Sequence, residues 1–108
     1  MWLVREGDVL ATAEVALDAR ARRRGLLGRD AVEGALVLRP CRHVHTFGMQ
    51  FPIDVAFCAV NGVVLRTCTL GPRRLSPVVP RAAFAIEAAA GSFDRWKLRA
   101  GDRVELRG

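Results

Sequence analysis

The chain has 108 residues, with 17 Lys or Arg against 11 Asp or Glu, so its formal net charge is +6. Hydrophobic residues make up 51% of the chain and charged residues 26%, which is typical of a folded globular domain and argues against a disordered protein. The longest stretches without a charged residue span 11 positions, too few for a membrane-spanning helix, which needs about 20 apolar residues. We therefore expect one domain over residues 1–108 and no membrane association.

The start of the chain and its cysteines bear on the compartment. Arg5 follows only four residues, whereas a signal peptide carries about 7–15 apolar residues at this place. The three cysteines form no CxxC pair and no even set, so the sequence predicts no disulfide framework. We predict a cytoplasmic protein with reduced thiols.

The hydrophobic pattern predicts strands over most of the chain and little helix. A short helix is expected over residues 19–27 with Asp18 as its N-cap, and a helical turn from Ser92, its predicted cap, to Trp96. Residues 71–80 hold three prolines and two arginines, which predicts a surface loop. The predicted strands cover residues 2–5, 9–15, 35–39, 41–47, 53–60, 63–69, 82–89 and 103–106. This order indicates an α+β fold that is mostly antiparallel β, a small curled sheet or barrel with one or two short helices.

The strongest local signal is Asn61-Gly62, which stands between two β-branched apolar runs. This dipeptide is the preferred centre of a two-residue type I′ hairpin turn. Such a turn pairs Val55 with Cys68, and Cys58 with Leu65. Because side chains alternate along a strand, Cys58 and Cys68 would point to opposite faces, which excludes a disulfide between them.

Cys41, His43 and His45 alternate along the chain as C-x-H-x-H. Thiolate and imidazole are ordinary zinc ligands, so a metal site is chemically conceivable. On a straight strand, however, neighbouring side chains of one face lie about 6.6 Å apart, too far for three of them to share one ion. We favour a half-buried histidine face with a core cysteine over a metal site, and we expect no cofactor.

Asp54 and Glu87 each stand alone in a long apolar stretch. A carboxylate in a cleft can act as a general acid or base, but an arginine partner or backbone N–H groups at a strand end would hold it as a structural anion. We favour the structural interpretation. Because arginine pairs bidentately with carboxylates, we predict that an arginine such as Arg29 or Arg42 holds at least one of the two acids.

The basic excess consists almost wholly of arginine, since 16 of the 17 positive residues are Arg. A run at Arg20, Arg22, Arg23 and Arg24 could contact phosphates if it lies on a helix. No aromatic residues interleave with this run and no nucleic-acid motif is present, so a solvated surface is favoured.

Several segments together resemble family 192 of the domains of unknown function. These segments are RRRGLLGR (22–29), HVHTFGMQFPIDVAF (43–57), NGVVL (61–65), AIEAAAG (85–91) and LRAGDRVEL (98–106). The resemblance spans most of the chain and implies a compact, barrel-like α+β domain, with no established activity or catalytic residue. Many relatives have a serine-phenylalanine-tryptophan type of sequence at positions 45–48, so His45 marks a subgroup, whereas Met49, Asp54 and Glu87 agree with the wider pattern.

The function predicted from these observations is a non-catalytic module that binds a small molecule or a peptide. The predicted site is a pocket or sheet edge formed by His45, Met49, Asp54 and Glu87. No Gly-rich phosphate loop, GxSxG, HExxH or CxxC motif is present, so no catalytic residue is assigned. A basic nucleic-acid-associated protein is the alternative, and a metal-dependent hydrolase built on His43 and His45 is the least favoured.

Overall fold

Strands form most of the regular structure in the computed structural model, which describes residues 1–16 and 34–108. The helix expected over residues 19–27, the basic run and Arg29 lie outside the described residues. The described elements are β1 (Trp2–Arg5), β2 (Asp8–Ala16), β3 (Ala35–Leu38), β4 (Ile53–Cys58), β5 (Val64–Leu70), β6 (Phe84–Ala89), α2 (Ser92–Trp96) and β7 (Val104–Arg107). The prediction of a mostly-β fold is confirmed, whereas an α+β fold is not clearly present, because the described residues hold one short helix beside the strands.

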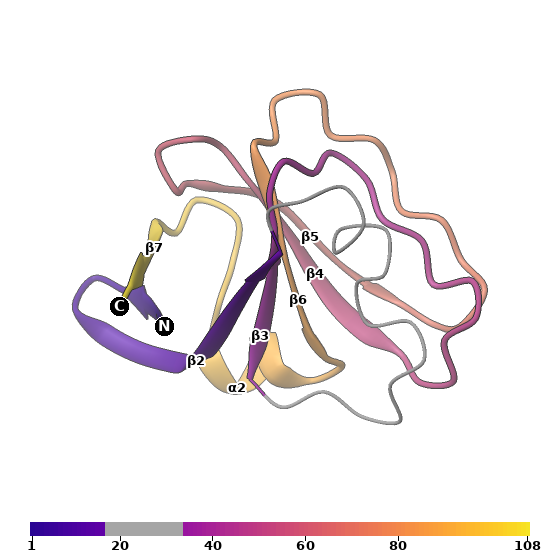
Figure 1. Ribbon diagram of the computed structural model, residues 1–108, viewed down its shortest axis with the longest axis horizontal. Coiled ribbons are helices and arrows are strands. Elements are labelled where there is room, and N and C mark those ends of the chain that lie inside the picture. The colour runs from indigo at the N-terminus through magenta and orange to yellow at the C-terminus, as the bar shows by residue number, and fades with distance from the viewer. Residues whose placement is uncertain (17–33) are drawn as a thin grey trace.

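The seven strands of the described residues belong to one mixed sheet with the order β5-β4-β6-β3-β2-β1-β7. Its pairings are antiparallel except the parallel pairing of β2 with β3. The long strand β2 joins two groups of strands, because residues 8–12 pair with β1 and residues 13–16 pair with β3. Figure 1 shows β1 and β7 set apart from the stack of β3, β6, β4 and β5, with the two termini side by side.

The sheet curls without closing into a barrel. Just before its edge strands β5 and β7 begin, Val63 and Arg103 form an isolated antiparallel bridge. Beside this bridge the Val64 amide donates to the Asp102 carbonyl at 2.7 Å, and the Gly101 amide donates to the Val64 carbonyl at 2.8 Å. We call the line between β5 and residues 97–103 the seam. It is bonded at one end and open at the other.

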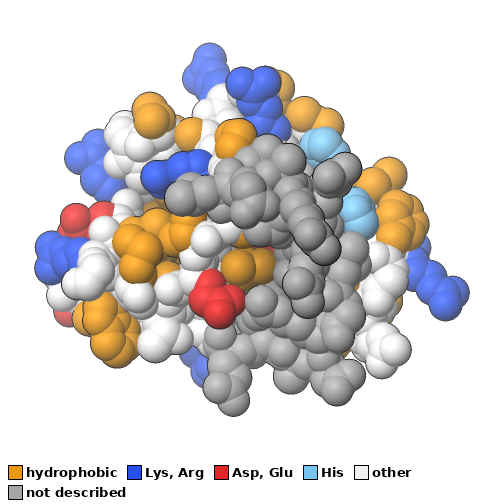
Figure 2. Space-filling model, viewed as in Figure 1, with side chains coloured by type: hydrophobic (Ala, Val, Ile, Leu, Met, Phe, Trp, Pro, Cys, Tyr) orange, Lys and Arg blue, Asp and Glu red, His pale blue; other side chains and the backbone are white. Residues whose placement is uncertain are grey.

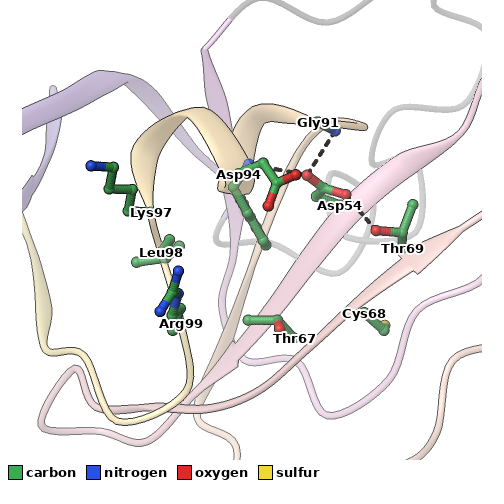
Figure 3. A pocket seen from close by; sticks show the side chains of 10 residues that line it. Asp54, Thr67, Cys68, Thr69, Gly91, Asp94, Lys97, Leu98 and Arg99 are labelled. Carbon is green, nitrogen blue, oxygen red and sulfur yellow. Dashed lines mark hydrogen bonds between the residues drawn. The ribbon is translucent and has the colours of Figure 1, made fainter.

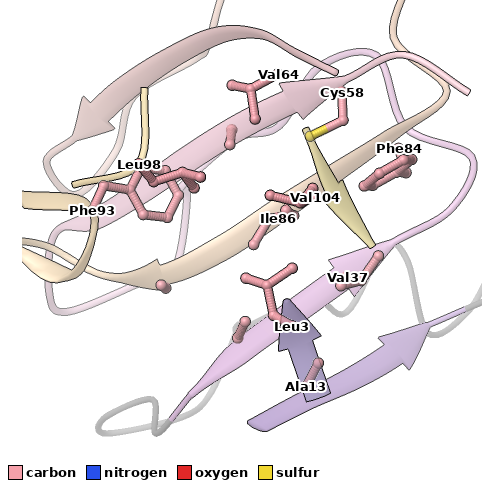
Figure 4. Close-up of a cluster of buried hydrophobic side chains, with 13 residues drawn as sticks. Leu3, Ala13, Val37, Cys58, Val64, Phe84, Ile86, Phe93, Leu98 and Val104 are labelled. Atoms are coloured by element: carbon pink, nitrogen blue, oxygen red, sulfur yellow. The ribbon is translucent and has the colours of Figure 1, made fainter. Parts of the chain in front are cut away.

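Two hydrophobic clusters lie on opposite faces of the central strands, which explains why β3 and β4 are buried along their whole length. The first cluster fills the curl and includes Leu3, Ala56, Ile86, Phe93 and Val104 (Figure 4). The second packs under two loops and includes residues such as Leu36, Val44, Met49, Val55 and Phe57. Each central strand therefore presents alternate side chains to two different cores.

The strand predicted over residues 41–47 is wrong. Only His45 of this segment forms a bridge, with Leu75. The alternation that suggested a strand is real, because Val44 and Thr46 are buried while His43 and His45 are exposed. Its partner is another loop, residues 71–80, which is joined to it by side chains as well as backbone, so no continuous ladder forms.

The hairpin of β4 and β5 confirms the predicted register in its middle and corrects it at its turn. Val55 pairs with Cys68 as expected, but a bulge pairs Cys58 with Val64 instead of Leu65. The Gly62 amide donates to the Ala59 carbonyl at 2.9 Å, and Gly62 has a φ of 89°. A type I′ turn needs positive φ at both central residues, and Asn61 does not adopt it. The loop is therefore longer than predicted and ends at a glycine in the left-handed region.

The three described cysteines are free, and Cys58 and Cys68 lie on opposite faces as predicted. Burial raises the pKa of the Cys58 thiol to about 12, although the positive charge of Arg39 lowers this pKa in part. Burial also raises the pKa of Cys68, against the opposing effect of Arg66. Both thiols therefore stay protonated near neutral pH, so neither presents a thiolate nucleophile.

Candidate functional site

A cavity of about 470 Å³ occupies the open end of the seam. On one side it is lined by Thr67, Cys68 and Thr69 of β5, and on the other by residues between 91 and 99. Asp54 of β4 closes one end, beside the start of α2 (Figure 3). We call this space the seam cavity.

The seam cavity follows the backbone edge of β5. Side chains alternate between faces, so a cavity over one face would be lined by Thr67 and Thr69 without Cys68. The Ala90 amide donates to the Pro52 carbonyl just before β4 begins. Because the direction of backbone hydrogen bonds alternates along a strand, this bond shows that every second residue of β4, starting with Asp54, bonds to β6, and that the residues between them bond to β5. Through the register of β4 with β5, Cys68 bonds β4, whereas Thr67 and Thr69 direct their backbone groups outward into the seam.

The Asp54 carboxylate connects the edge strand to the helix. Its side chain is almost fully buried, at 4% exposure, and accepts three hydrogen bonds from groups of the chain. Oδ1 accepts from Thr69 Oγ1 at 2.7 Å, and Oδ2 accepts from the amides of Gly91 at 3.0 Å and Phe93 at 3.1 Å. This carboxylate therefore joins both walls of the seam cavity at the end of the cavity that Asp54 closes.

The cap of α2 differs from the one predicted. Gly91 is the N-cap residue and has no side chain to offer, while Ser92 is the first helical residue. The Ser92 hydroxyl accepts a hydrogen bond from Arg95 Nη2 at 3.1 Å. Asp54 supplies the acceptor that an N-cap side chain provides in other helices, and its negative charge lies at the favourable, positive end of the helix dipole.

The seam cavity has polar walls that carry both signs of charge. Asp94 lies near Asp54 at the closed end, and Lys97 and Arg99 lie along the far wall (Figure 3). Asp102 holds that wall in place, because its carboxylate accepts from the Arg99 amide at 3.0 Å. A ligand with a cationic and an anionic group would therefore find a partner for each within this cavity.

The structure separates the two lone acids. The register pairs Asp54 with Ala88, which belongs to the core inside the curl. It pairs Glu87 with Leu36 and Val55, which belong to the core on the other face. Because paired residues point to the same side of a sheet, Asp54 and Glu87 point to opposite faces and cannot share one pocket.

The other predicted site residues also lie away from the seam cavity. Met49 packs in the core on the face of Glu87, and His45 is exposed on a loop. Of the four predicted residues only Asp54 lines the seam cavity. A role in ligand binding for His45, Met49 and Glu87 stays a prediction.

Among the described residues no arginine pairs with Asp54, and the prediction of an arginine partner is untested for Glu87. The acceptor bonds of Asp54 come from a hydroxyl and two backbone amides, and no described arginine forms an ion pair with it. Arg42 is exposed, and Arg29 lies outside the described residues. An arginine partner for Glu87 therefore stays a prediction.

The predicted metal ligands do not gather in one place. His43 and His45 are exposed, and the Cys41 thiol donates a hydrogen bond to the His43 carbonyl at 3.2 Å. Over residues 1–16 and 34–108, no group of three or more His, Cys, Asp or Glu side chains is arranged to hold a metal ion.

Residues 41–51 and 71–80 form a second notable feature, which we call the two-loop surface. Thr46 is fully buried between the loops, and its hydroxyl donates to the Gly71 carbonyl at 2.6 Å and accepts from the Arg74 amide at 2.7 Å. Ser76 Oγ accepts from the Val44 amide at 2.8 Å. These bonds give the two loops one fixed shape.

The exposed side of the two-loop surface is basic and partly aromatic. It presents Arg42, Arg73 and Arg74, and neither loop contains an acidic residue. The rings of His45 and Phe47 lie 5.5 Å apart, and Phe47 is 49% exposed. In Figure 2 the two histidines lie beside hydrophobic and basic side chains at the edge of the view.

Comparison with protein-family models decides the family. The model of DUF192, described as an uncharacterized ACR, matches residues 2–106. The chain belongs to the DUF192 family. This match confirms the resemblance found in the sequence, and it covers both the seam cavity and the two-loop surface.

Two solved structures share the fold of this DUF192 domain. A candidate transcription regulator from Sinorhizobium meliloti superposes with a TM-score of 0.79 at 22% identity, covering 96% of this chain and 89% of the other. A protein of unknown function from Novosphingobium aromaticivorans superposes with a TM-score of 0.76 at 18% identity, covering 87% and 74%. No curated protein matches the chain.

Sequence reasoning missed most of the lining of the DUF192 seam cavity. The register predicted for the hairpin already placed Thr69 opposite Asp54, which was a usable signal for one wall. Lys97 and Arg99 gave no such signal, because their position depends on the curl of the sheet.

Within the described residues, no helix has the length and apolarity needed to cross a membrane.

Proposed function

We propose that this DUF192 domain is a non-catalytic binding module that takes a short extended peptide along β5. The observation that carries this proposal is the seam cavity, which is bounded by the outward backbone groups of Thr67 and Thr69. An extended peptide can add to such an edge, so that backbone hydrogen bonds give affinity and side-chain contacts give specificity. The cavity supplies the space that this added strand needs.

The bonding along the seam supports an added strand at this place. Val64 already uses its outward amide and carbonyl in bonds to Asp102 and Gly101, so the edge of β5 is paired up to that residue. Beyond it, no described backbone group bonds the outward groups of Thr67 and Thr69. A peptide would continue the pairing over the part of β5 that lines the cavity, from Thr67 to Thr69.

The charges of the cavity predict the kind of peptide. Asp94 near the closed end favours a basic residue, whereas Lys97 and Arg99 on the far wall favour an acidic residue or a terminal carboxylate. Asp54 is already engaged by three donors, so we assign it to holding the site rather than to contacting the ligand.

The test is a single change in the backbone of β5. Heptapeptides selected from a random displayed library are resynthesised and titrated by calorimetry against the parent domain and against Thr67→Pro. The proline removes the outward amide of an edge strand, where proline is tolerated. We expect it to weaken binding by about tenfold or more, because a peptide hydrogen bond is lost and the ring blocks the edge.

Thr67→Val is the matched control, because it keeps the amide and nearly the same side-chain shape. It should bind the selected peptides within about twofold of the parent domain, on the view that strand addition depends on backbone groups. Equal affinity for Thr67→Pro and Thr67→Val would contradict the proposal, as would a selection that enriches no peptide. Thermal unfolding of both variants establishes that they are folded.

A specific observation also favours a second candidate function, the binding of single-stranded nucleic acid. The two-loop surface joins arginines that can contact phosphates with rings on which bases can stack. The solved neighbour from Sinorhizobium meliloti is described as a candidate transcription regulator, and it shares the fold with this chain.

Salt-dependent binding tests this second candidate. Affinity for a fluorescent oligothymidine is measured at several salt concentrations for Arg73→Gln/Arg74→Gln and for Arg95→Gln/Arg107→Gln, which removes equal charge elsewhere. If the two-loop surface holds the strand, the first variant lowers the slope of log affinity against log salt by about 1.4, from two lost phosphate contacts. The control keeps the parent slope. The same slope in both variants, or no binding at low salt, would exclude this function.

A further inference from the structure

The seam cavity is blocked along β5 at one of its ends. There the Val64 amide donates to the Asp102 carbonyl at 2.7 Å, and the Gly101 amide donates to the Val64 carbonyl at 2.8 Å. A strand added along Thr67 and Thr69 would meet this bonded segment and could not continue past it along the edge. The edge of β5 therefore suits a chain that stops at the bonded end of the seam.

The bonded segment also indicates the direction of an added strand. It runs antiparallel to β5, as the bridge of Val63 with Arg103 shows. Antiparallel pairing is slightly more stable per residue than parallel pairing, so the same direction is favoured for a peptide. Because β5 runs from Val64 at the bonded end to Thr69 beside Asp54, such a peptide has its carboxyl end at the bonded end and its amino end beside Asp54.

The charged side chains of the seam cavity follow the order that this direction requires. Asp94 lies near Asp54, where the amino end of the peptide would be (Figure 3). Arg99 lies on the side of Thr67, two residues before the bonded segment begins, and Lys97 adds a second positive charge to that wall. The opposite direction would place the amino end at a cation and the carboxylate at the acids, so both contacts would be repulsive.

The two cationic side chains of this wall are free to meet a ligand. Lys97 and Arg99 are exposed, and neither forms an ion pair with a described residue. The nearby Asp102 carboxylate accepts from the backbone amide of Arg99 at 3.0 Å and pairs with Arg5 Nη1 at 3.3 Å. Arg5 Nη1 also donates to the Lys97 carbonyl at 2.8 Å. The wall is therefore held through its backbone, which leaves both positive charges for a ligand.

We propose that the seam cavity binds the free carboxyl terminus of a peptide chain. The last residues of the chain pair antiparallel to β5, and the terminal carboxylate lies at Arg99 and Lys97, since a guanidinium presents a planar fork of donors that suits a carboxylate. This inference rests on the proposed peptide binding along β5, and it adds the direction of the peptide and the nature of its end. Backbone bonds hold any extended segment, whereas the two cations select a chain end over an internal segment.

The test compares one peptide in three forms. A heptapeptide is selected from a library whose members end in a free carboxylate. It is then synthesised as the free acid, as the C-terminal amide, and with two alanines added after its last residue. Calorimetric titration should show the amide bound about fivefold more weakly than the acid, because two exposed cations lose their partner. The lengthened peptide should lose at least as much, because the bonded end of the seam blocks it.

A charge variant assigns the carboxylate to its partner. Arg99→Gln should weaken the free acid and reduce the difference between acid and amide to about twofold or less. Arg81→Gln is the matched control, because Arg81 is also exposed but lies outside the lining of the cavity, and it should keep the whole difference. Both substitutions are at exposed positions, and Arg99→Gln keeps the backbone amide that bonds Asp102.

The length of the ligand distinguishes two sources of such a carboxylate. The last three residues of the heptapeptide are tested alone, as the free acid and as the amide. Affinity near that of the heptapeptide assigns the site to short free peptides, and much weaker binding assigns it to the tails of proteins. Preference for the acid supports the proposal in both cases.

The outcomes separate this inference from the peptide binding on which it rests. Equal affinity for the acid, the amide and the lengthened peptide overturns the assignment to a carboxyl terminus, as does an unchanged difference between acid and amide in Arg99→Gln. If Thr67→Pro then weakens all three forms, strand addition along β5 stands without it. If Thr67→Pro weakens none of them, or if the selection enriches no peptide, both proposals fail.

Discussion

Replacing Asp54 with alanine is expected to lower the free energy of unfolding by about 3 kcal/mol, because it removes the acceptor of three hydrogen bonds at once. Phe93 is buried, so its amide would lose its partner where water does not replace it well. A helix of five residues is not stable alone, so α2 depends on this anchor. Urea denaturation monitored by circular dichroism gives the change in stability.

Two milder variants separate the contributions of Asp54. Thr69→Val removes only the hydroxyl donor to Oδ1 and should cost about 1 kcal/mol. Asp54→Asn keeps an oxygen for the amides of Gly91 and Phe93 and should fall between the two other variants. In Asp54→Ala, the fluorescence of Trp96, whose ring lies 5.6 Å from that of Phe93, should change before global unfolding. A loss no larger in Asp54→Ala than in Thr69→Val would contradict the anchoring role.

The same geometry shows why the sequence predicted Asp54 but not its setting. Alternation within β4 and within β6 says which residues of each strand share a face. It does not say which face of β4 matches which face of β6, since the two strands are far apart in sequence and their register is fixed only by tertiary packing. The isolation of Asp54 and Glu87 in the sequence was therefore a correct signal of buried acids, but their placement on opposite faces of the sheet could not be derived from it.

At the two-loop surface, the burial pattern was predicted correctly but the secondary structure was not. The alternation of buried and exposed residues at positions 43–46 was present in the sequence, and the structure keeps it. The segment nevertheless lacks a ladder, because its partner loop is joined through Thr46 and Ser76 side chains. A period of two indicates which side chains are buried. It does not establish that a neighbouring strand exists.

The turn at residues 59–62 differs from the predicted turn because it contacts the start of β7 as well as connecting β4 and β5. Gly62 accepts a hydrogen bond from the Val104 amide at 2.9 Å, next to the bridge of Val63 with Arg103. A Cβ built on Gly62 would overlap the Val104 carbonyl oxygen. Glycine is therefore required at position 62 for two reasons. It adopts a left-handed φ of 89°, and it lets the turn approach β7 closely at the bonded end of the seam.

Gly62→Ala is accordingly expected to cost about 4 kcal/mol, the sum of left-handed strain and of the lost contact with β7. Gly101→Ala is the matched control, because Gly101 has a φ of 97° and nothing within 4 Å of its built Cβ. That variant carries the strain alone and should cost about 1–2 kcal/mol. The difference between the two, measured by urea denaturation, isolates the packing of β7 against the turn.

This difference also predicts where Gly62→Ala acts. Hydrogen exchange should speed up first at the amides of Val64 and Val104, which form the bonded end of the seam, while the amides of β4 and β6 stay protected. The seam cavity depends on that end, since it begins beyond Val64, where the bonds between β5 and residues 101–102 stop. Equal losses of stability in Gly62→Ala and Gly101→Ala would mean that the bonded end of the seam does not hold the curl of the sheet.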